Sequence, residues 1–100
     1  LPVLAIGGKG VVSVVANIVP QDTADLVKAW AEGKTEEARN LFYKLLPLCK
    51  AMFFETNPIP VKTSAALMGL IGDEMRLPMC HMAPANLEKL KTVLVDYGLV

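Results

Sequence analysis

The spacing of apolar side chains changes from a strand-like to a helix-like period near Pro20. Residues 11–19, "VVSVVANIV", form an almost continuous run of β-branched and small apolar side chains, which suit a pleated strand better than a helix. Such a run is typical of a strand buried on both faces of a parallel sheet. We therefore predict one β-strand here. The sequence offers no equally clear second strand to pair with its backbone groups.

Two helices are predicted in the segments that follow. In "QDTADLVKAWAEGK", apolar residues recur at helical spacing, Asp22 or Thr23 is a candidate cap, and Gly33 is a candidate left-handed stop. In "TEEARNLFYKLLPLCKAMFFE", Thr35 is a candidate cap and two glutamates occupy the first turn, where the helix dipole favours anions. Pro47 lies inside this second pattern and is expected to kink the helix or split it in two.

Two further helices complete the predicted elements. In "NPIPVKTSAALMGL", Asn57 can cap a helix that begins at Pro58 and runs to about Leu70. "MRLPMCHMAP" is expected to be an extended connection with two prolines. The last helix lies in "ANLEKLKTVLVDYG", and its expected inward-facing residues are Leu87, Leu90, Val93, Leu94 and Tyr97. The expected fold of this chain is mainly α, with one strand.

The apolar content is high for a chain of this size. Hydrophobic residues make up 53% of the 100 positions, whereas a small domain has proportionally more surface to cover with polar groups. The chain begins at Leu1 rather than Met, and its first residues, "LPVLAI", resemble the last turns of a helix. We therefore expect it to be the C-terminal piece of a longer protein.

The charge balance disfavours some classes of binding partner, and the cysteine spacing bears on the cellular location. Ten basic and ten acidic residues balance without a run of like charge, so neither nucleic acid nor an anionic membrane surface is an expected partner. No apolar run approaches the roughly 18 residues that cross a bilayer, and no signal peptide is visible. Cys49 and Cys80 lie far apart without a CxxC spacing, which favours reduced thiols and a cytoplasmic location.

The motifs that suggest chemistry are weak. "GGKG" lacks the spacing of a phosphate-binding loop and precedes the predicted strand instead of following one. Cys80 and His81 are neighbours on an extended segment, so their side chains are expected to point apart. The five methionines are interpreted as core packing rather than a soft-metal site. The sequence therefore predicts no catalytic residue, metal ligand or cofactor within these 100 positions.

A family resemblance accounts for the unpaired strand. "GGKGVVSVVANIVP", "AEGKTEEAR", "LLPLCKAMFFETNPIPVKTSAALMGL", "RLPM" and the closing "YGLV" occur in the order found at the end of the dihydrodipicolinate synthase family, which the chain resembles along essentially all of its length. The resemblance implies a parent α/β protein, a (β/α)8 TIM barrel with a C-terminal helical extension. Residues 1–20 would be the last barrel segment, comprising the end of the seventh helix and the eighth strand. Residues 21–100 would be the final barrel helix and the extension.

The resemblance also implies an activity for that parent. Members are lyases of the class I aldolase type, in which a lysine forms a Schiff base with pyruvate and the product condenses with aspartate semialdehyde in lysine and diaminopimelate biosynthesis. The lysine would lie upstream of this chain, since Lys9 and Lys62 match no Schiff-base position, so the chain alone is expected to be inactive. The complete enzyme would be a homo-oligomer, with a tetramer expected.

Two positions match substrate-binding residues of the family. Val12 corresponds to a strand residue whose backbone lies beside the pyruvate imine, and Asn57 to an asparagine near the pocket mouth, although helix capping is its stronger interpretation. Two alternatives remain open. The parent could be another pyruvate-dependent aldolase, such as an N-acetylneuraminate lyase or a keto-deoxy sugar acid aldolase, or the chain could be a non-catalytic helical interaction module.

Overall fold

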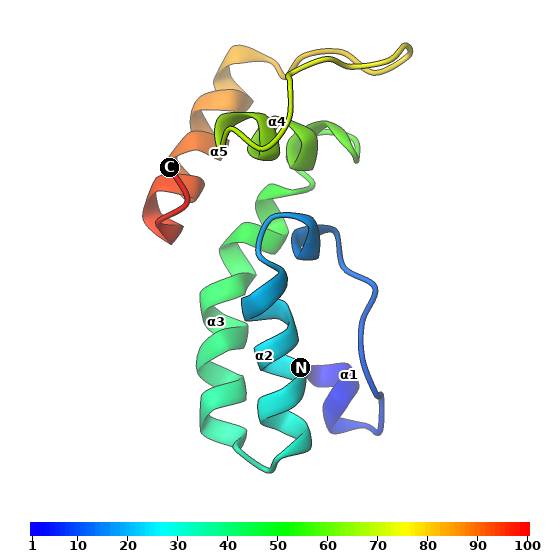
Figure 1. Ribbon diagram of the computed structural model, residues 1–100, viewed down its shortest axis with the longest axis vertical. Helices are drawn as coiled ribbons and strands as arrows, with labels where there is room; N and C mark the ends of the chain where they lie inside the picture. The colour runs from blue at the N-terminus through cyan, green and yellow to red at the C-terminus, as the bar shows by residue number, and fades with distance from the viewer.

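The computed structural model describes residues 1–100 and contains helices joined by loops. Helices α2 and α3 lie side by side as an antiparallel hairpin, while α4, α5 and a projecting loop form the other end of the molecule (Figure 1). In chain order the elements are α1 (Pro2–Ala5), the 3₁₀ helix η1 (Val14–Asn17), α2 (Pro20–Ala31), α3 (Thr35–Ala51), α4 (Ile59–Leu67) and α5 (Pro84–Tyr97).

The turn between α2 and α3 confirms the predicted stop at Gly33. Its φ of 75° is left-handed, a conformation that glycine adopts without a steric penalty. The backbone N–H groups of Gly33 and Lys34 close the end of α2 by donating to Trp30 O and Ala29 O, at 3.0 and 2.8 Å. The short connection makes α2 and α3 antiparallel neighbours, and their packing forms the largest helix–helix contact of the chain.

The predicted caps of α2 and α3 are wrong. The N-cap positions are Val19 and Lys34, and neither provides a side-chain hydrogen bond to the helix. Helix α2 begins instead with Pro20, which suits a first-turn position because the N–H that it lacks would have no helical partner there. Thr23 lies inside the helix, where its Oγ1 donates to Val19 O at 2.9 Å. Pro47 lies within α3 and does not split it.

The core joins α3 to α5. The packing confirms the predicted inward face of α5, because Leu90 and Leu94 are fully buried and the other members of that face pack against the core. Met52 and Met82 are buried too, and the remaining methionines contact the same cluster, which confirms their packing role. The largest fully buried side chains in this region are Leu48, Met52, Leu90 and Leu94.

Helix α4 is shorter than predicted and has a different N-terminus. It begins at Ile59, with Pro58 rather than Asn57 at the N-cap and without a side-chain cap. The capping role predicted for Asn57 is therefore wrong. The helix ends before Leu70 because Gly69 adopts a left-handed φ of 76° and Leu70 N donates back to Ala65 O at 2.9 Å.

The predicted β-strand is absent. Ser13 has extended dihedral angles (φ −128°, ψ 133°), but the chain turns into η1 at Val14. No backbone group of residues 9–12 takes part in a backbone–backbone hydrogen bond within the chain. A strand is defined by its ladder of hydrogen bonds, and no neighbouring segment supplies one here. The extended conformation expected of the β-branched run therefore reaches only to Ser13.

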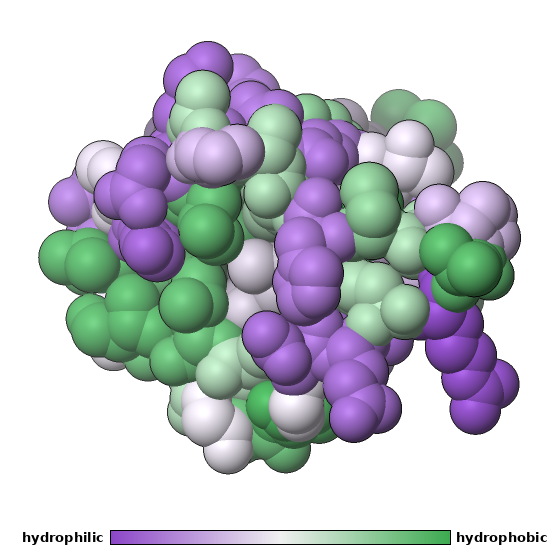
Figure 2. All heavy atoms as spheres, turned by 90° about the horizontal axis from the view of Figure 1, so that it is seen from above, coloured by the Kyte–Doolittle hydropathy of each residue, from purple (hydrophilic) through white to green (hydrophobic).

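The molecule leaves much of its surface uncovered. It is elongated, with extents of 42 × 25 × 21 Å and a radius of gyration of 14.5 Å, against about 13 Å for a compact chain of this length. Its accessible surface is 6349 Å², whereas a folded monomer of this mass has about 5500 Å². Figure 2 shows apolar side chains gathered in a continuous area on one side of the face seen from above. None of the helices has the length and apolar character required to span a membrane.

Candidate functional site

Val12 lies on the extended segment between α1 and η1. Val12 is fully exposed, whereas the flanking Val11 and Ser13 line an apolar cleft against the helices. This alternation is the one expected of extended backbone, in which successive side chains point to opposite sides. The segment thus presents Val12 away from α2 and α3 and holds its neighbours towards them.

The cleft behind this segment has a volume of about 340 Å³. Its walls come from α1, the extended segment, α2 and α3, and they are mostly aliphatic; Thr23 and Cys49 are among the few heteroatom-bearing side chains. Burial raises the pKa of the Cys49 thiol, which disfavours the reactive thiolate. The cleft is therefore a surface suited to packing hydrocarbon rather than to covalent chemistry.

Asn57 is exposed in the turn between α3 and α4, and its side chain makes no hydrogen bond within the chain. The 3₁₀ helix η1 contacts α2, α3 and α4, so the end of the valine run is packed against the helix that follows Asn57. No hydrogen bond joins Val12 to Asn57. The structure brings their two segments to one end of the α2–α3 hairpin without joining the two residues.

A polar cluster that the sequence analysis missed joins three helices. Lys44 Nζ on α3 lies 2.7 Å from Asp22 Oδ2 on α2 and 4.9 Å from the centroid of the Tyr97 ring on α5. The Tyr97 hydroxyl donates to the same Asp22 oxygen. The hydrogen bonds from Lys44 and then Tyr97 lower the pKa of Asp22 despite some opposition from burial. Burial, followed by the hydrogen bond to Asp22, raises the pKa of Tyr97.

Glu55 supplies a second long-range contact, at the start of α5. Its Oε2 accepts hydrogen bonds from the Ala83 backbone N–H at 2.9 Å and from Asn86 Nδ2 at 3.1 Å. Ala83 is the N-cap of α5 and has no side-chain acceptor of its own, so Glu55 provides a carboxylate at the positive end of the helix dipole. Lys62 Nζ donates to Glu74 O at 2.8 Å and ties α4 to the loop that precedes α5.

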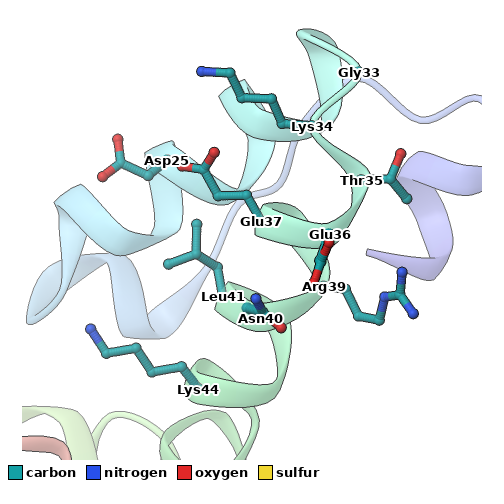
Figure 3. A pocket seen from close by; sticks show the side chains of 10 residues that line it. All are labelled: Asp25, Gly33, Lys34, Thr35, Glu36, Glu37, Arg39, Asn40, Leu41 and Lys44. Atoms are coloured by element: carbon teal, nitrogen blue, oxygen red, sulfur yellow. The ribbon is translucent and has the colours of Figure 1, made fainter.

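A broad polar hollow lies beside the Gly33 turn and the first turns of α3 (Figure 3). Its charged side chains have both signs. Figure 3 shows Arg39 and Lys44 pointing to opposite sides of α3, while Asp25 lies on the neighbouring α2. No group of three His, Cys, Asp or Glu side chains lies close enough to hold a metal ion in this chain. The hollow is formed by solvated helix faces, in accord with the balanced charge of the sequence.

Comparison with known proteins identifies the family of the chain. Residues 1–96 match the model of the "Dihydrodipicolinate synthetase family". The chain belongs to this family. It is 59% identical over its whole length to a 4-hydroxy-tetrahydrodipicolinate synthase of Thermodesulfovibrio yellowstonii, covering 34% of that protein. It is 54% identical to one from Methanocaldococcus jannaschii, covering 35%.

Solved structures agree with this assignment. The dihydrodipicolinate synthase of Aquifex aeolicus superimposes with a TM-score of 0.94 at 45% identity, over 99% of this chain and 34% of that one. The Thermotoga maritima dihydrodipicolinate synthase gives a TM-score of 0.92 at 44% identity, over 97% and 33%. The chain thus spans about a third of the length of these dihydrodipicolinate synthetase family members and has the fold of the corresponding part. The family resemblance in the sequence is confirmed.

The site residues that sequence analysis missed share one property. Asp22 and Tyr97 are separated by 75 positions, and Glu55 and Ala83 by 28. Hydrophobic periodicity reports neighbours three or four positions apart on one helix, so it gives no signal for such pairs. The signal that was available for Glu55 was indirect, because the start of α5 contains neither Ser, Thr nor Asp to cap it.

Proposed function

We propose that this chain forms the C-terminal third of a 4-hydroxy-tetrahydrodipicolinate synthase. The complete enzyme would condense pyruvate with aspartate semialdehyde through a lysine Schiff base, in lysine and diaminopimelate biosynthesis. One observation carries the proposal: curated relatives with this name match the entire chain at identities of 47% to 59%. Those identities favour the synthase over other pyruvate-dependent aldolases and over a non-catalytic helical module.

In this proposal, residues 1–20 form the last segment of a (β/α)8 barrel, and residues 21–100 form its final helix and helical extension. The extended segment around Val12 would be the eighth strand. Barrel strands alternate between side chains that face the interior and side chains that face the surrounding helices. Val11 and Ser13 line the cleft against the helices while Val12 points away from it, which supports an inward orientation for Val12.

Val12 would then form part of the substrate pocket wall. Its backbone carbonyl has no partner within the chain, so its dipole is free to face the pyruvate imine, and its side chain would exclude water from the reacting amine. Partial desolvation lowers the pKa of an amine and keeps it nucleophilic. Asn57 would lie near the pocket mouth, where its exposed amide, which is not used as a helix cap, remains available for hydrogen bonding.

The covalent centre would lie outside this chain. Schiff-base formation requires a free amine that attacks the pyruvate carbonyl and expels water, and the resulting enamine then attacks the aldehyde carbon. Lys62 is engaged with Glu74 O at 2.8 Å, and Lys9 lies on an exposed part of the extended segment, outside the cleft lining. Neither lysine occupies a pocket that would desolvate it, so the chain alone would not form the imine.

Borohydride trapping tests this proposal. The 100-residue chain is incubated with pyruvate, reduced and weighed, in parallel with the complete enzyme. We expect a pyruvyl adduct on the complete enzyme, also in a Val12→Ile variant that keeps the carbonyl, but not on the isolated chain. Val12→Pro should abolish the adduct in the complete enzyme, because proline removes a ladder donor from a central strand. An adduct on Lys9 or Lys62 would show that the assignment is wrong, and turnover of sugar-acid substrates would favour the other aldolases.

The proposal extends to assembly and location. One solved relative, 44% identical to this chain, is described as the first monomeric dihydrodipicolinate synthase variant, and that wording supports oligomers among other members. We propose that the complete enzyme is a cytoplasmic homotetramer. Sedimentation of the complete protein measures its mass directly.

A further inference from the structure

Glu55 anchors the turn between α3 and α4 to the start of α5. None of residues 53–58 in this turn is buried, and among them only Glu55 has a side chain that hydrogen-bonds within the chain. Its Oε2 accepts from the Ala83 N–H at 2.9 Å and from Asn86 Nδ2 at 3.1 Å. One carboxylate oxygen therefore joins the turn to a helix that begins 28 positions after Glu55.

The electrostatics of this contact favour a firm anchor. A carboxylate forms stronger hydrogen bonds than a neutral acceptor, and this one lies at the positive end of the α5 dipole. Glu55 forms no ion pair with a Lys or Arg of the chain. This chain superimposes over 99% of its length on the longer Aquifex aeolicus synthase, so the backbone arrangement of the two segments is not a consequence of the shorter chain.

Asn57 lies two positions after Glu55, in the same turn. The turn that contains it is closed by a hydrogen bond from Ile59 N to Thr56 O at 2.9 Å. The Asn57 side chain is exposed and makes no hydrogen bond of its own within the chain. A side chain without such contacts lies where its backbone places it. The anchor at Glu55 therefore sets the position of the Asn57 amide relative to α5.

We propose that Glu55 is a positioning residue for Asn57. The inference rests on the function proposed above, in which Asn57 lies near the pocket mouth and pyruvate is bound covalently before the aldehyde reacts. A group at the mouth then faces the second substrate, aspartate semialdehyde, as it enters. Glu55 touches neither substrate. It holds the turn where the Asn57 amide can donate a hydrogen bond to an oxygen of the aldehyde substrate, and such orientation lowers the entropic cost of binding.

Steady-state kinetics of the complete enzyme test this role, with aspartate semialdehyde varied at saturating pyruvate. Glu55→Ala releases the turn and should raise KM for the aldehyde by about two- to tenfold, the range for one lost hydrogen bond. The value of kcat and the KM for pyruvate should stay within about twofold, because the lost contact is made equally before and during the reaction. Glu55→Gln keeps an oxygen that can accept both hydrogen bonds and should restore KM. Asn57→Ala should raise KM as much as Glu55→Ala, and combining the two should add nothing further.

Tyr97→Phe is the matched control for lost stability. It removes a hydrogen bond at the other end of α5, about 20 Å along the helix from Ala83, and should destabilise the fold at least as much as Glu55→Ala. It should leave KM unchanged, because the turn with Asn57 is held at the start of α5. Asn86→Ala removes only one of the two hydrogen bonds to Glu55 and should give a smaller rise in KM. That variant provides the test even where Glu55→Ala does not fold.

Borohydride trapping separates a failure of this inference from a failure of the proposed function. The unaltered enzyme and Glu55→Ala should both form the pyruvyl adduct, because the anchor acts on the second substrate. An unaltered complete enzyme without the adduct would overturn the proposed function and this inference together. Where the adduct forms, the inference alone is overturned by an unchanged KM in Glu55→Ala, an equal rise in Tyr97→Phe, a Glu55→Gln variant that does not restore KM, or additive effects of Glu55→Ala and Asn57→Ala.

Discussion

The hydrogen bond between Tyr97 and Asp22 offers the clearest test of what holds α5 to the hairpin. Tyr97→Phe removes only the hydroxyl and leaves the ring beneath Lys44, whose Nζ lies 4.9 Å from its centroid. Asp22 keeps its ion pair with Lys44 at 2.7 Å. The substitution therefore isolates one hydrogen bond to a charged group, and it does so without opening a cavity.

The magnitude follows from the environment of the pair. Hydrogen bonds to charged groups contribute about 1.5 to 3 kcal/mol. A value around the lower end of that range applies because the Asp22 side chain is 24% exposed and water can replace part of the bond. We expect Tyr97→Phe to lower the free energy of unfolding by about 1 to 2 kcal/mol. The ion pair between Lys44 and Asp22 should contribute less than about 1 kcal/mol, because Lys44 is half exposed.

Urea unfolding at one fixed protein concentration measures the effect. The matched control is Tyr43→Phe, since the Tyr43 hydroxyl makes no hydrogen bond within the chain and its side chain is 63% exposed; it should change stability by less than about 0.5 kcal/mol. A double-mutant cycle of Tyr97→Phe with Asp22→Ala, which removes the acceptor oxygen, should give a coupling energy of the same size as the loss in Tyr97→Phe. Equal effects of the two tyrosine substitutions would refute the assignment.

The pKa shifts of Tyr97 and Asp22 make the contribution of their hydrogen bond to folding stability depend on pH. The pKa of Tyr97 is raised in the folded chain from an ordinary value of 10.0, so its contribution is complete below pH 10 and is lost as the pH rises further. The pKa of Asp22 is lowered from 3.8, so its contribution is present above pH 3.8 and is lost as the pH falls through the lower folded value. Tyr97→Phe should flatten the alkaline loss. An identical alkaline profile in that variant would contradict the argument.

The remaining predictions concern the two ends of α5, and urea unfolding measures both. Glu55→Ala removes the acceptor of the Ala83 N–H and should cost about 1 kcal/mol, whereas Glu74→Ala, whose side chain makes no hydrogen bond within the chain, should cost less than about 0.5 kcal/mol. Gly98→Ala should cost about 1 to 2 kcal/mol because its φ is 91°. Gly72→Ala, in open space without a positive φ, should be neutral or stabilising by up to about 1 kcal/mol. Equal effects within either pair would contradict the corresponding mechanism.

Helices and their apolar faces were predictable from sequence because their determinants are local. The face of α5 that includes Leu90 and Leu94 repeats at helical spacing, and the same spacing that identifies the helix selects the residues that become buried. The stop at Gly33 was equally local, since it depends on one residue's access to positive φ. The cap predictions failed at all three helices for which they were made. Prolines in the first turns of α2 and α4 set the helix starts without side-chain caps, and α3 begins at Thr35 itself, after Lys34.

The strand prediction failed because a strand is a property of a pair of segments. Residues 11–19 have the composition of a central strand, yet β propensity expresses how a side chain fits a pleated, buried surface rather than an intrinsic backbone preference. Without that surface the run divides: an extended edge up to Ser13, followed by the 3₁₀ turn that begins at Val14. The proposed site residues also depend on segments outside this chain. Val12 and Asn57 are exposed, and only the family resemblance distinguishes them from other exposed residues.

The residues that stabilise the folded chain differ from the proposed substrate-binding residues, because the latter are exposed. The helices pack against one another within the chain, so substitutions at Leu94 or Tyr97 change the folding stability of the chain itself. Val12 is fully exposed and has no contact to lose, and surface substitutions of this kind change stability by less than about 0.5 kcal/mol. Whatever Val12 contributes must therefore arise from a partner outside the folded helices. In the complete enzyme proposed above, that partner would be the neighbouring strands of the barrel, which would engage the N–H and C=O groups of residues 9–13.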